Sequence, residues 1–233
     1  MEGEGNLVER RSEKAYFTFG RFQPPTLGHG RLIDELAKTA VDNRADAYVF
    51  VSSTVDKKKN PLTVFQKVSW LKHMFPAVDV RFINTTTCRK GFATVAPKQE
   101  CKTIFAVIDV LRSAGYTEVT LCVGSDRVPD FTKMLAKFTP EGIAVHVLGL
   151  GGTRNETASN LSGMSGTKMR EAALRSNVPA FLAGTGLPED SARVLMGQVQ
   201  AGMRGGKRTR ARTQNAHKNL KRTLRRNRTR NHA

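Results

Sequence analysis

The chain has 233 residues, which is enough for one well-packed domain with tails and too few for two domains of typical size. Its composition, with 39% hydrophobic and 25% charged residues, is that of a globular protein. No apolar run approaches the roughly 18 to 20 residues that cross a bilayer, so we expect no membrane association.

The net charge of +18 is distributed unevenly along the chain. Residues 204–233 contain 12 Lys and Arg and no Asp or Glu, so the rest of the chain has 26 basic and 20 acidic residues. Because this tail is almost without apolar residues, we expect it to be disordered. It is interpreted first as an arm that binds nucleic acid through phosphate contacts. A nuclear-localisation signal and a merely solubilising tail are the alternatives.

Three cysteines, Cys88, Cys101 and Cys122, form an odd set without metal-like spacing. We expect free thiols in a reducing compartment, and therefore a cytoplasmic or other intracellular protein. The basic tail makes a nuclear or virion-associated location the alternative.

Strand patterns alternate with helical patterns along the first 150 residues. In chain order we expect a strand at 15–20, a helix at about 30–41, a strand at 46–52, a helix at 63–75 with Thr63 as its N-cap, a strand at 78–83, a helix at 101–114, a strand at 119–123, a helix that includes 131–138 and a strand at 143–148. This alternation predicts an α/β fold whose parallel sheet is covered by helices on both faces.

The pattern changes after residue 150. A long loop rich in Gly, Asn and Thr is followed by expected helices at 167–175, 179–183 and 189–203. The predicted organisation is a flexible segment (1–14), one domain (15–187), a C-terminal helix (188–203) and the basic tail (204–233).

The segment Gly20–His29 (GRFQPPTLGH) joins the first expected strand to the first expected helix. Ligands of such folds lie beyond the carboxyl ends of the strands, where these loops meet helix N-termini. Gly20 would let the backbone approach a phosphate, and Gly28 would open a helix N-terminus that favours an anion. Thr26 and His29 could then donate hydrogen bonds to the same phosphate. The alternative is a proline-containing loop with an ordinary first-turn histidine.

This segment resembles the (H/T)xGH signature of the nucleotidyltransferase superfamily, with Thr26 at its first position. Further along, Met164–Arg170 (MSGTKMR) resembles the family's late (I/M)S(S/G)Tx(I/M)R motif. In that family the late motif begins a helix whose hydroxyl groups and arginine hold the β- and γ-phosphates. Thr167 and Arg170 are about one helical turn apart, so both can face one phosphate group. A capped amphipathic helix is the alternative.

Two middle segments extend the resemblance. Val123–Arg127 (VGSDR) resembles the family's G-x-D element, which passes near the nucleotide or the acceptor. Asp56–Thr63 (DKKKNPLT) resembles the NP(F/L)T segment of nicotinamide-mononucleotide adenylyltransferases. Alternatively, the first is a strand-end turn and the second a solvated lysine run.

Together the four segments most resemble nucleotidyltransferase-like proteins of large phages and DNA viruses, over about residues 15–187. The resemblance implies a Rossmann-like three-layer sandwich with a mostly parallel five-stranded sheet, and it does not extend to residues 204–233. It implies catalytic roles for His29, Thr26 and Arg170. It implies nucleotide contacts from Gly20, Arg21, Phe22, Gly28, Gly124, Asp126, Ser165 and Thr167, and weaker acceptor contacts from Lys59, Asn60 and Arg127.

The implied activity is transfer of a nucleoside monophosphate, first AMP from ATP, to a phosphorylated small-molecule acceptor with release of pyrophosphate. Nicotinamide mononucleotide is the first expected acceptor, followed by phosphopantetheine or a sugar phosphate, and cytidylyl transfer is the alternative chemistry. Mg²⁺ is expected with the triphosphate, and no carboxylate cluster marks metal ligands. A rival of another class is a catalytically degenerate fold that binds nucleic acid or packages a particle. Joint retention of Thr26, His29, Thr167 and Arg170 favours the enzyme.

Overall fold

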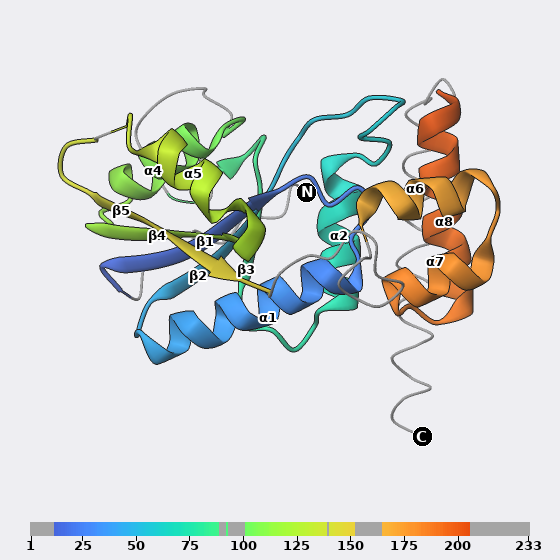
Figure 1. The fold of residues 1–233 in the computed structure, drawn as a ribbon, viewed down its shortest axis with the longest axis horizontal. Helices are drawn as coiled ribbons and strands as arrows, with labels where there is room; N and C mark the ends of the chain where they lie inside the picture. Colours follow the sequence, from blue (N-terminus) through green and yellow to red (C-terminus); the bar gives the residue numbers. More distant parts are fainter. Residues whose placement is uncertain (1–11, 89–91, 93–100, 139, 152–164, 206–233) are drawn as a thin grey trace, which may run out of the picture.

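A computed structural model describes residues 12–88, 92, 101–138, 140–151 and 165–205 (Figure 1). Its elements are, in chain order, β1 (Lys14–Gly20), α1 (Leu27–Asp42), β2 (Asp46–Val51), α2 (Val64–Met74), β3 (Arg81–Asn84), α4 (Ile104–Ser113), β4 (Glu118–Gly124), a 3-10 turn η1 (Ser125–Arg127), α5 (Val128–Leu135), β5 (Ala144–Leu150), α6 (Gly166–Leu174), α7 (Val178–Thr185) and α8 (Glu189–Arg204). The expected order of strands and helices is confirmed. The expected loop at 152–164 and residues 206–233 of the basic tail lie outside the described residues.

The five strands form one sheet in the order β3-β2-β1-β4-β5, and every neighbouring pair is parallel. β1 is therefore central, with β2 on one side and β4 on the other. The strand order reverses between β1 and β4, and in open α/β sheets ligands bind at the carboxyl edge of such a crevice. Gly20, the last residue of β1, lies opposite Val51 of β2 at that edge.

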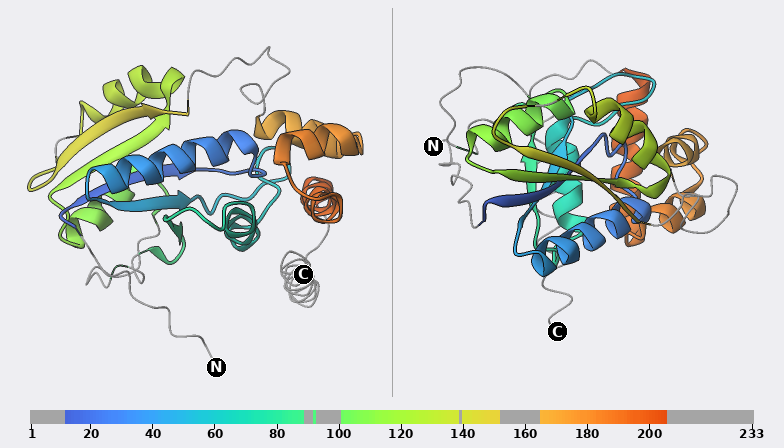
Figure 2. Two further views of the ribbon diagram at one scale, coloured as in Figure 1. Left: turned by 90° about the horizontal axis from the view of Figure 1, so that it is seen from below. Right: turned by 60° about the vertical axis from the view of Figure 1, so that its left-hand side comes forward.

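Helices cover both faces of the sheet (Figure 2). One face carries Phe17, Phe50 and Leu121 against α4 and α5, and the other carries Val49 and Val51 against α1 and α2. Successive strand residues point to opposite faces, so strands buried on both sides read as continuous apolar runs. The three-layer α/β sandwich expected from the sequence is confirmed.

The last three helices, α6, α7 and α8, pack together at one end of the molecule (Figure 1). Phe181, Leu195 and Val199 form their shared core, which also contains Trp70 of α2. The indole of Trp70 donates a hydrogen bond to Gln198 Oε1 at 2.9 Å. None of the helices in the described parts of the chain is long and apolar enough to cross a membrane.

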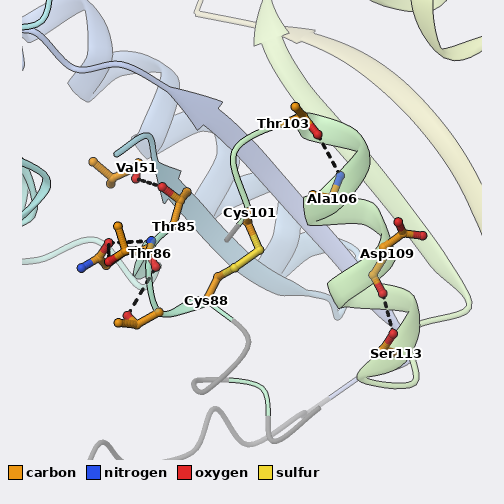
Figure 3. The surroundings of a disulfide bond; sticks show 11 residues. Val51, Thr85, Thr86, Cys88, Cys101, Thr103, Ala106, Asp109 and Ser113 are labelled. Carbon is orange, nitrogen blue, oxygen red and sulfur yellow. Dashed lines mark hydrogen bonds between the residues drawn. A yellow bond between two sulfur atoms is a disulfide. The ribbon is translucent and has the colours of Figure 1, made fainter. Parts of the chain in front are cut away.

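The expectation of three free thiols is wrong, because Cys88 and Cys101 form a disulfide (Figure 3). Both cysteines are buried, with Cα atoms 6.3 Å apart, and the Cys101 N–H donates to the Thr85 carbonyl oxygen at 2.9 Å. Counting cysteines could not reveal this pair, because the pairing depends on how the chain returns from β3 to α4. The remaining cysteine, Cys122, is free, and burial raises the pKa of its thiol to about 12, which excludes a reactive thiolate there.

Candidate active site

The loop between β1 and α1 is shaped by a glycine and a phenylalanine. The Gly20 carbonyl oxygen accepts from the Ser52 N–H at 2.9 Å, which ties the ends of β1 and β2 together. Phe22 has a left-handed backbone with φ of 47°, and its buried ring lies so close that a Cβ on Gly20 would be 2.6 Å from it. The structure therefore requires a glycine at position 20 for the packing of Phe22, a reason that the sequence pattern did not supply.

Gln23 fixes the same loop to the start of α2. Its side chain is almost fully buried and makes two hydrogen bonds to the Leu62 backbone, one to the carbonyl oxygen and one from the N–H, both at 2.9 Å. Sequence reasoning missed this residue. The only signal for it was its place inside the proline-containing segment, where a polar side chain between Phe22 and Pro24 is easily taken for a solvated one.

Thr26 and His29 form a reciprocal cap at the N-terminus of α1. Thr26 is the N-cap residue, and its backbone N–H donates to His29 Nδ1 at 3.1 Å. The Thr26 hydroxyl lies 2.9 Å from the same nitrogen. Because Nδ1 accepts, the proton of the neutral imidazole is on Nε2, which is the form that can donate to an anionic oxygen.

Arg170 joins the two main motifs, which are far apart in the sequence. One guanidinium nitrogen donates to the Gln23 carbonyl oxygen at 2.7 Å, and another donates to Thr167 Oγ1 at 3.0 Å. Ser165 caps α6 by accepting from the Lys168 N–H at 3.3 Å, which the alternative of a capped amphipathic helix explains as well. A Cβ at Gly166 would lie 2.9 Å from the Gln23 carbonyl oxygen, so a glycine lets α6 approach the β1–α1 loop.

The electrostatics at this junction suit a bound anion. Burial of the Arg170 guanidinium lowers its pKa from the ordinary value, and the nearby charge of Arg21 lowers it further, while Asp56 opposes the shift. Two guanidinium groups that repel each other in a partly desolvated place are stabilised when a phosphate group neutralises both. Arg21, which the resemblance names, is exposed and near enough for its charge to act on Arg170.

The segment after β2 is folded around Asp56. Its Oδ1 accepts from the backbone N–H groups of Lys58 at 2.9 Å and Lys59 at 2.6 Å, and these bonds with those from Asn60 lower the pKa of Asp56 to about 2. Lys59 is exposed, whereas Asn60 is 5% exposed and its Oδ1 has no hydrogen-bond partner among the described residues. Of the two residues in this segment that are expected to contact the acceptor, Lys59 is therefore the accessible one.

The third expected segment lies at the end of β4, on the other side of the crevice. Gly124 ends the strand, and Asp126 and Arg127 form the exposed turn η1 that follows. Arg127 contacts its own helix, with its guanidinium 5.3 Å from the Phe131 ring and 4.0 Å from the Asp130 carboxylate. In the described parts of the chain, neither Asp126 nor Arg127 has a hydrogen bond or ion pair with the first or last motif, although their segment follows the carboxyl end of β4.

The described residues contain no group of three or more His, Cys, Asp and Glu that could hold a metal ion. The junction combines cationic and neutral donors, among them Arg170 and Thr167, with the nearby carboxylate of Asp56 acting on Arg170. A cavity of about 300 Å³ lies elsewhere, at the amino edge of the sheet, and is lined by residues that include Arg44, Asp46, Asp79 and Arg81. No motif residue lines it, so the chemistry is assigned to the carboxyl edge.

Comparison with known families gives one match, to the cytidylyltransferase-like family, over residues 17–172. No curated protein matches the chain. Two similar solved structures are of a bifunctional NMN adenylyltransferase/ADP ribose pyrophosphatase from Francisella tularensis, one of them complexed with AMP and a manganese ion. The complex is 15% identical to this chain with a TM-score of 0.37, and the match covers 68% of this chain and 42% of the other. The second structure is 13% identical with a TM-score of 0.43, and the match covers 82% of this chain and 52% of the other.

A third similar structure, a macrolide-efflux protein from Streptococcus pneumoniae, is 16% identical with a TM-score of 0.40 and covers 83% of this chain and 59% of that one. The chain thus spans about half the length of the solved structures that it matches.

Proposed function

The chain belongs to the cytidylyltransferase-like family of nucleotidyltransferases, and on this premise we propose that it transfers AMP from ATP to a phosphorylated small-molecule acceptor. The observation that carries the proposal is the hydrogen bond from Arg170 to the Gln23 carbonyl oxygen, which joins motifs 147 residues apart. It places the Arg170 guanidinium beside the loop that ends in Thr26 and His29. A scaffold that binds no triphosphate would not need these groups at one place.

The proposed reaction needs no covalent enzyme intermediate. A phosphate oxygen of the acceptor attacks the α-phosphorus, the bond between that phosphorus and the bridging oxygen breaks, and pyrophosphate leaves with both bonding electrons. Charge develops on the non-bridging oxygens of the α-phosphate, and His29 Nε2–H would donate to one of them. Arg170, with Thr167 and Ser165, would bind the departing pyrophosphate. Arg21 would neutralise part of the negative charge of the pyrophosphate.

Magnesium would enter with the triphosphate as part of the substrate. Mg²⁺ is commonly held by one or two carboxylates together with substrate phosphates and water. The described residues contain no cluster of three or more possible metal ligands, and Asp56 is a carboxylate that acts on Arg170 at the junction. We therefore assign no protein ligand to the ion and no step of the reaction to it.

The acceptor would bind on the side of Lys59 and Asn60. The Asn60–Thr63 segment resembles that of nicotinamide-mononucleotide adenylyltransferases, so nicotinamide mononucleotide is the first acceptor to test, before phosphopantetheine and sugar phosphates. Cytidylyl transfer is the second reaction to test. The chain belongs to the cytidylyltransferase-like family, so CTP is included among the donor nucleotides.

A labelling experiment tests the proposal. ATP or CTP carrying the label in the α-phosphate or in the γ-phosphate is incubated with each acceptor. We expect the α-label in an acceptor adduct and the γ-label in pyrophosphate. Release of labelled inorganic phosphate without an adduct would indicate a triphosphatase instead, and no product with any pair would favour the degenerate, nucleic-acid-binding alternative.

A second function, binding of nucleic acid, is proposed for the basic tail. Residues 206–233 contain 11 Lys and Arg and no Asp or Glu. The last described residue, Gly205, lies against Lys57, since a Cβ there would be 2.5 Å from the lysine Nζ. The chain therefore enters the tail beside Lys57, and the basic residues of the tail would bind the phosphates of the nucleic acid.

A further inference from the structure

Lys67 of α2 is a charged residue inside the protein. Its side chain is 0% exposed, and its ammonium group donates to the Ser52 carbonyl oxygen and lies 3.5 Å from Ser52 Oγ. Burial lowers the pKa of this amine to about 8, so at neutral pH most molecules still carry the charge. Helical periodicity is a signal for this burial, because Lys67 occupies the same helix face as the buried residues Val64, Trp70 and Leu71.

Three features of this environment disfavour a cation. The side chain is removed from water, no carboxylate of the described residues forms an ion pair with it, and it lies within the first turns of α2, near the positive end of the helix dipole. A buried lysine contributes less to packing than an apolar side chain of the same length would. A lysine in such a place is therefore better explained by function than by stability.

Lys67 lies next to the start of the β1–α1 loop, which is the proposed phosphate-binding loop. Ser52 follows the end of β2, and its N–H donates to the Gly20 carbonyl oxygen at 2.9 Å. Gly20 begins the loop that leads to Thr26 and His29. Lys67 is thus connected to the loop through two consecutive hydrogen bonds, and the Gln23–Leu62 pairing holds the loop against the start of the same helix.

We infer that Lys67 is a positioning residue for the triphosphate: its ammonium fixes the carboxyl ends of β2 and β1 and adds positive charge behind the loop that holds the phosphates. The inference rests on the proposed function. Because screening by water is weak inside a protein, a buried charge acts on a nearby bound anion more strongly than an exposed one does. The site would then prefer highly charged ligands, with triphosphate and pyrophosphate bound more tightly than a nucleoside monophosphate.

The test compares Lys67→Met, which keeps the length of the side chain and removes its charge, with Lys72→Met as a matched control. Lys72 is an exposed lysine of the same helix. Calorimetric titration gives the Kd for ATP, pyrophosphate and AMP, and thermal unfolding gives Tm. The basic tail is the same in all proteins, so its contribution cancels in the comparison.

For Lys67→Met we expect a protein that stays folded, with ATP and pyrophosphate bound about tenfold more weakly and AMP affected less. This loss corresponds to about 1.4 kcal/mol. Lys72→Met should match the wild type in all measurements. A Lys67→Met protein that fails to fold, or that loses affinity for ATP, pyrophosphate and AMP equally, would show that the lysine serves the fold alone, and unchanged affinities would likewise overturn the inference.

The experiment also separates this inference from the proposed function. If the wild type binds ATP and pyrophosphate but makes no labelled adduct, the proposed transfer fails while the role of Lys67 in binding stands. If the wild type transfers AMP and Lys67→Met does so with unchanged constants, the inference alone fails. A wild type that binds neither ligand would overturn both.

Discussion

At the scale of single residues, Arg170 has two roles that can be separated. It donates to the Gln23 carbonyl oxygen, and in the proposed reaction it would also offer a planar guanidinium to a phosphate. We expect Arg170→Ala to weaken ATP binding by roughly 10- to 100-fold, as loss of a charged hydrogen bond does. Arg170→Lys should restore only part of the affinity, because an ammonium cannot bind two oxygens in one plane.

Calorimetric titration with a non-hydrolysable ATP analogue measures this effect. Arg175→Ala, at the exposed C-terminal end of the same helix, is the control and should bind as the wild type does. Identical affinities for Arg170→Ala and the wild type would remove this arginine from the site.

Lys67 also predicts how stability changes with pH. Its pKa is about 8 in the folded protein, against an ordinary value of 10.5, so the unfolded chain binds more protons between these pH values. Stability of the wild type should therefore rise with pH in this window, relative to Lys67→Met, by up to about 3 kcal/mol.

Denaturant titrations from pH 7 to 10.5 give the free energies of unfolding. Taking the difference between the two proteins cancels the opposite effect of Tyr48 and Tyr116, whose pKa values are raised by burial. A difference that stays constant over this range would mean that Lys67 is not desolvated.

The motifs led to the prediction that Thr26, His29, Thr167 and Arg170 belong to one site, and the structure joins the two segments that carry them through the bond from Arg170 to Gln23. Gln23 and Lys67 were not identified, because their roles depend on backbone groups of Leu62 and Ser52 that only the fold brings near. A local sequence pattern indicates the chemistry that a side chain can perform. It does not indicate which backbone group, distant in the sequence, that side chain binds in the folded protein.

At the scale of elements, a glycine of α8 allows this helix to pack closely against the segment that contains Pro61. A Cβ at Gly202 would lie 2.1 Å from the Pro61 carbonyl oxygen, which is a rigid backbone atom, whereas one at Gly197 of the same helix would meet nothing within 4 Å. Gly202→Ala should therefore destabilise the protein by about 1 to 3 kcal/mol through overpacking. Gly197→Ala should stabilise it by up to about 1 kcal/mol through helix propensity.

Chemical denaturation of the two variants measures both effects. If Gly202→Ala gains stability as Gly197→Ala does, α8 does not pack on Pro61 in solution. A loss of acceptor affinity in Gly202→Ala alone would further link this contact to the acceptor side.

The order of elements followed from periodicity, while several boundaries did not. α1 begins at Leu27 instead of about residue 30, because the cap formed by Thr26 and His29 starts the helix before its apolar face does. β3 begins at Arg81 instead of Val78, although Val78 and Val80 pack against the core. Burial gives both valines a strand-like pattern, but pairing with β2 begins only at Arg81.

At the scale of the whole molecule, the domain and the basic tail are expected to act separately. Deleting residues 206–233, which keeps α8 intact, should leave turnover of small substrates unchanged, since the motifs end at Arg170. The same deletion should remove most of the binding to nucleic acid of any sequence. Binding by the full chain should fall by orders of magnitude between about 50 and 200 mM salt.

Salt titrations of labelled DNA and RNA against both proteins test this separation. Equal affinities of the two proteins would refute the role of the tail, and salt-insensitive binding would show that the contacts are not mainly to phosphates.

The central claim, that the β1–α1 loop and α6 form one nucleotidyl-transfer site, is tested most directly by the rate of pyrophosphate release from His29→Ala. The account predicts a folded protein whose turnover is about 100- to 1,000-fold slower, because one preorganised donor to the transition state is lost. His146→Ala, at an exposed position of β5, is the control and should keep the wild-type rate. A folded His29→Ala protein with near-normal turnover would contradict the account.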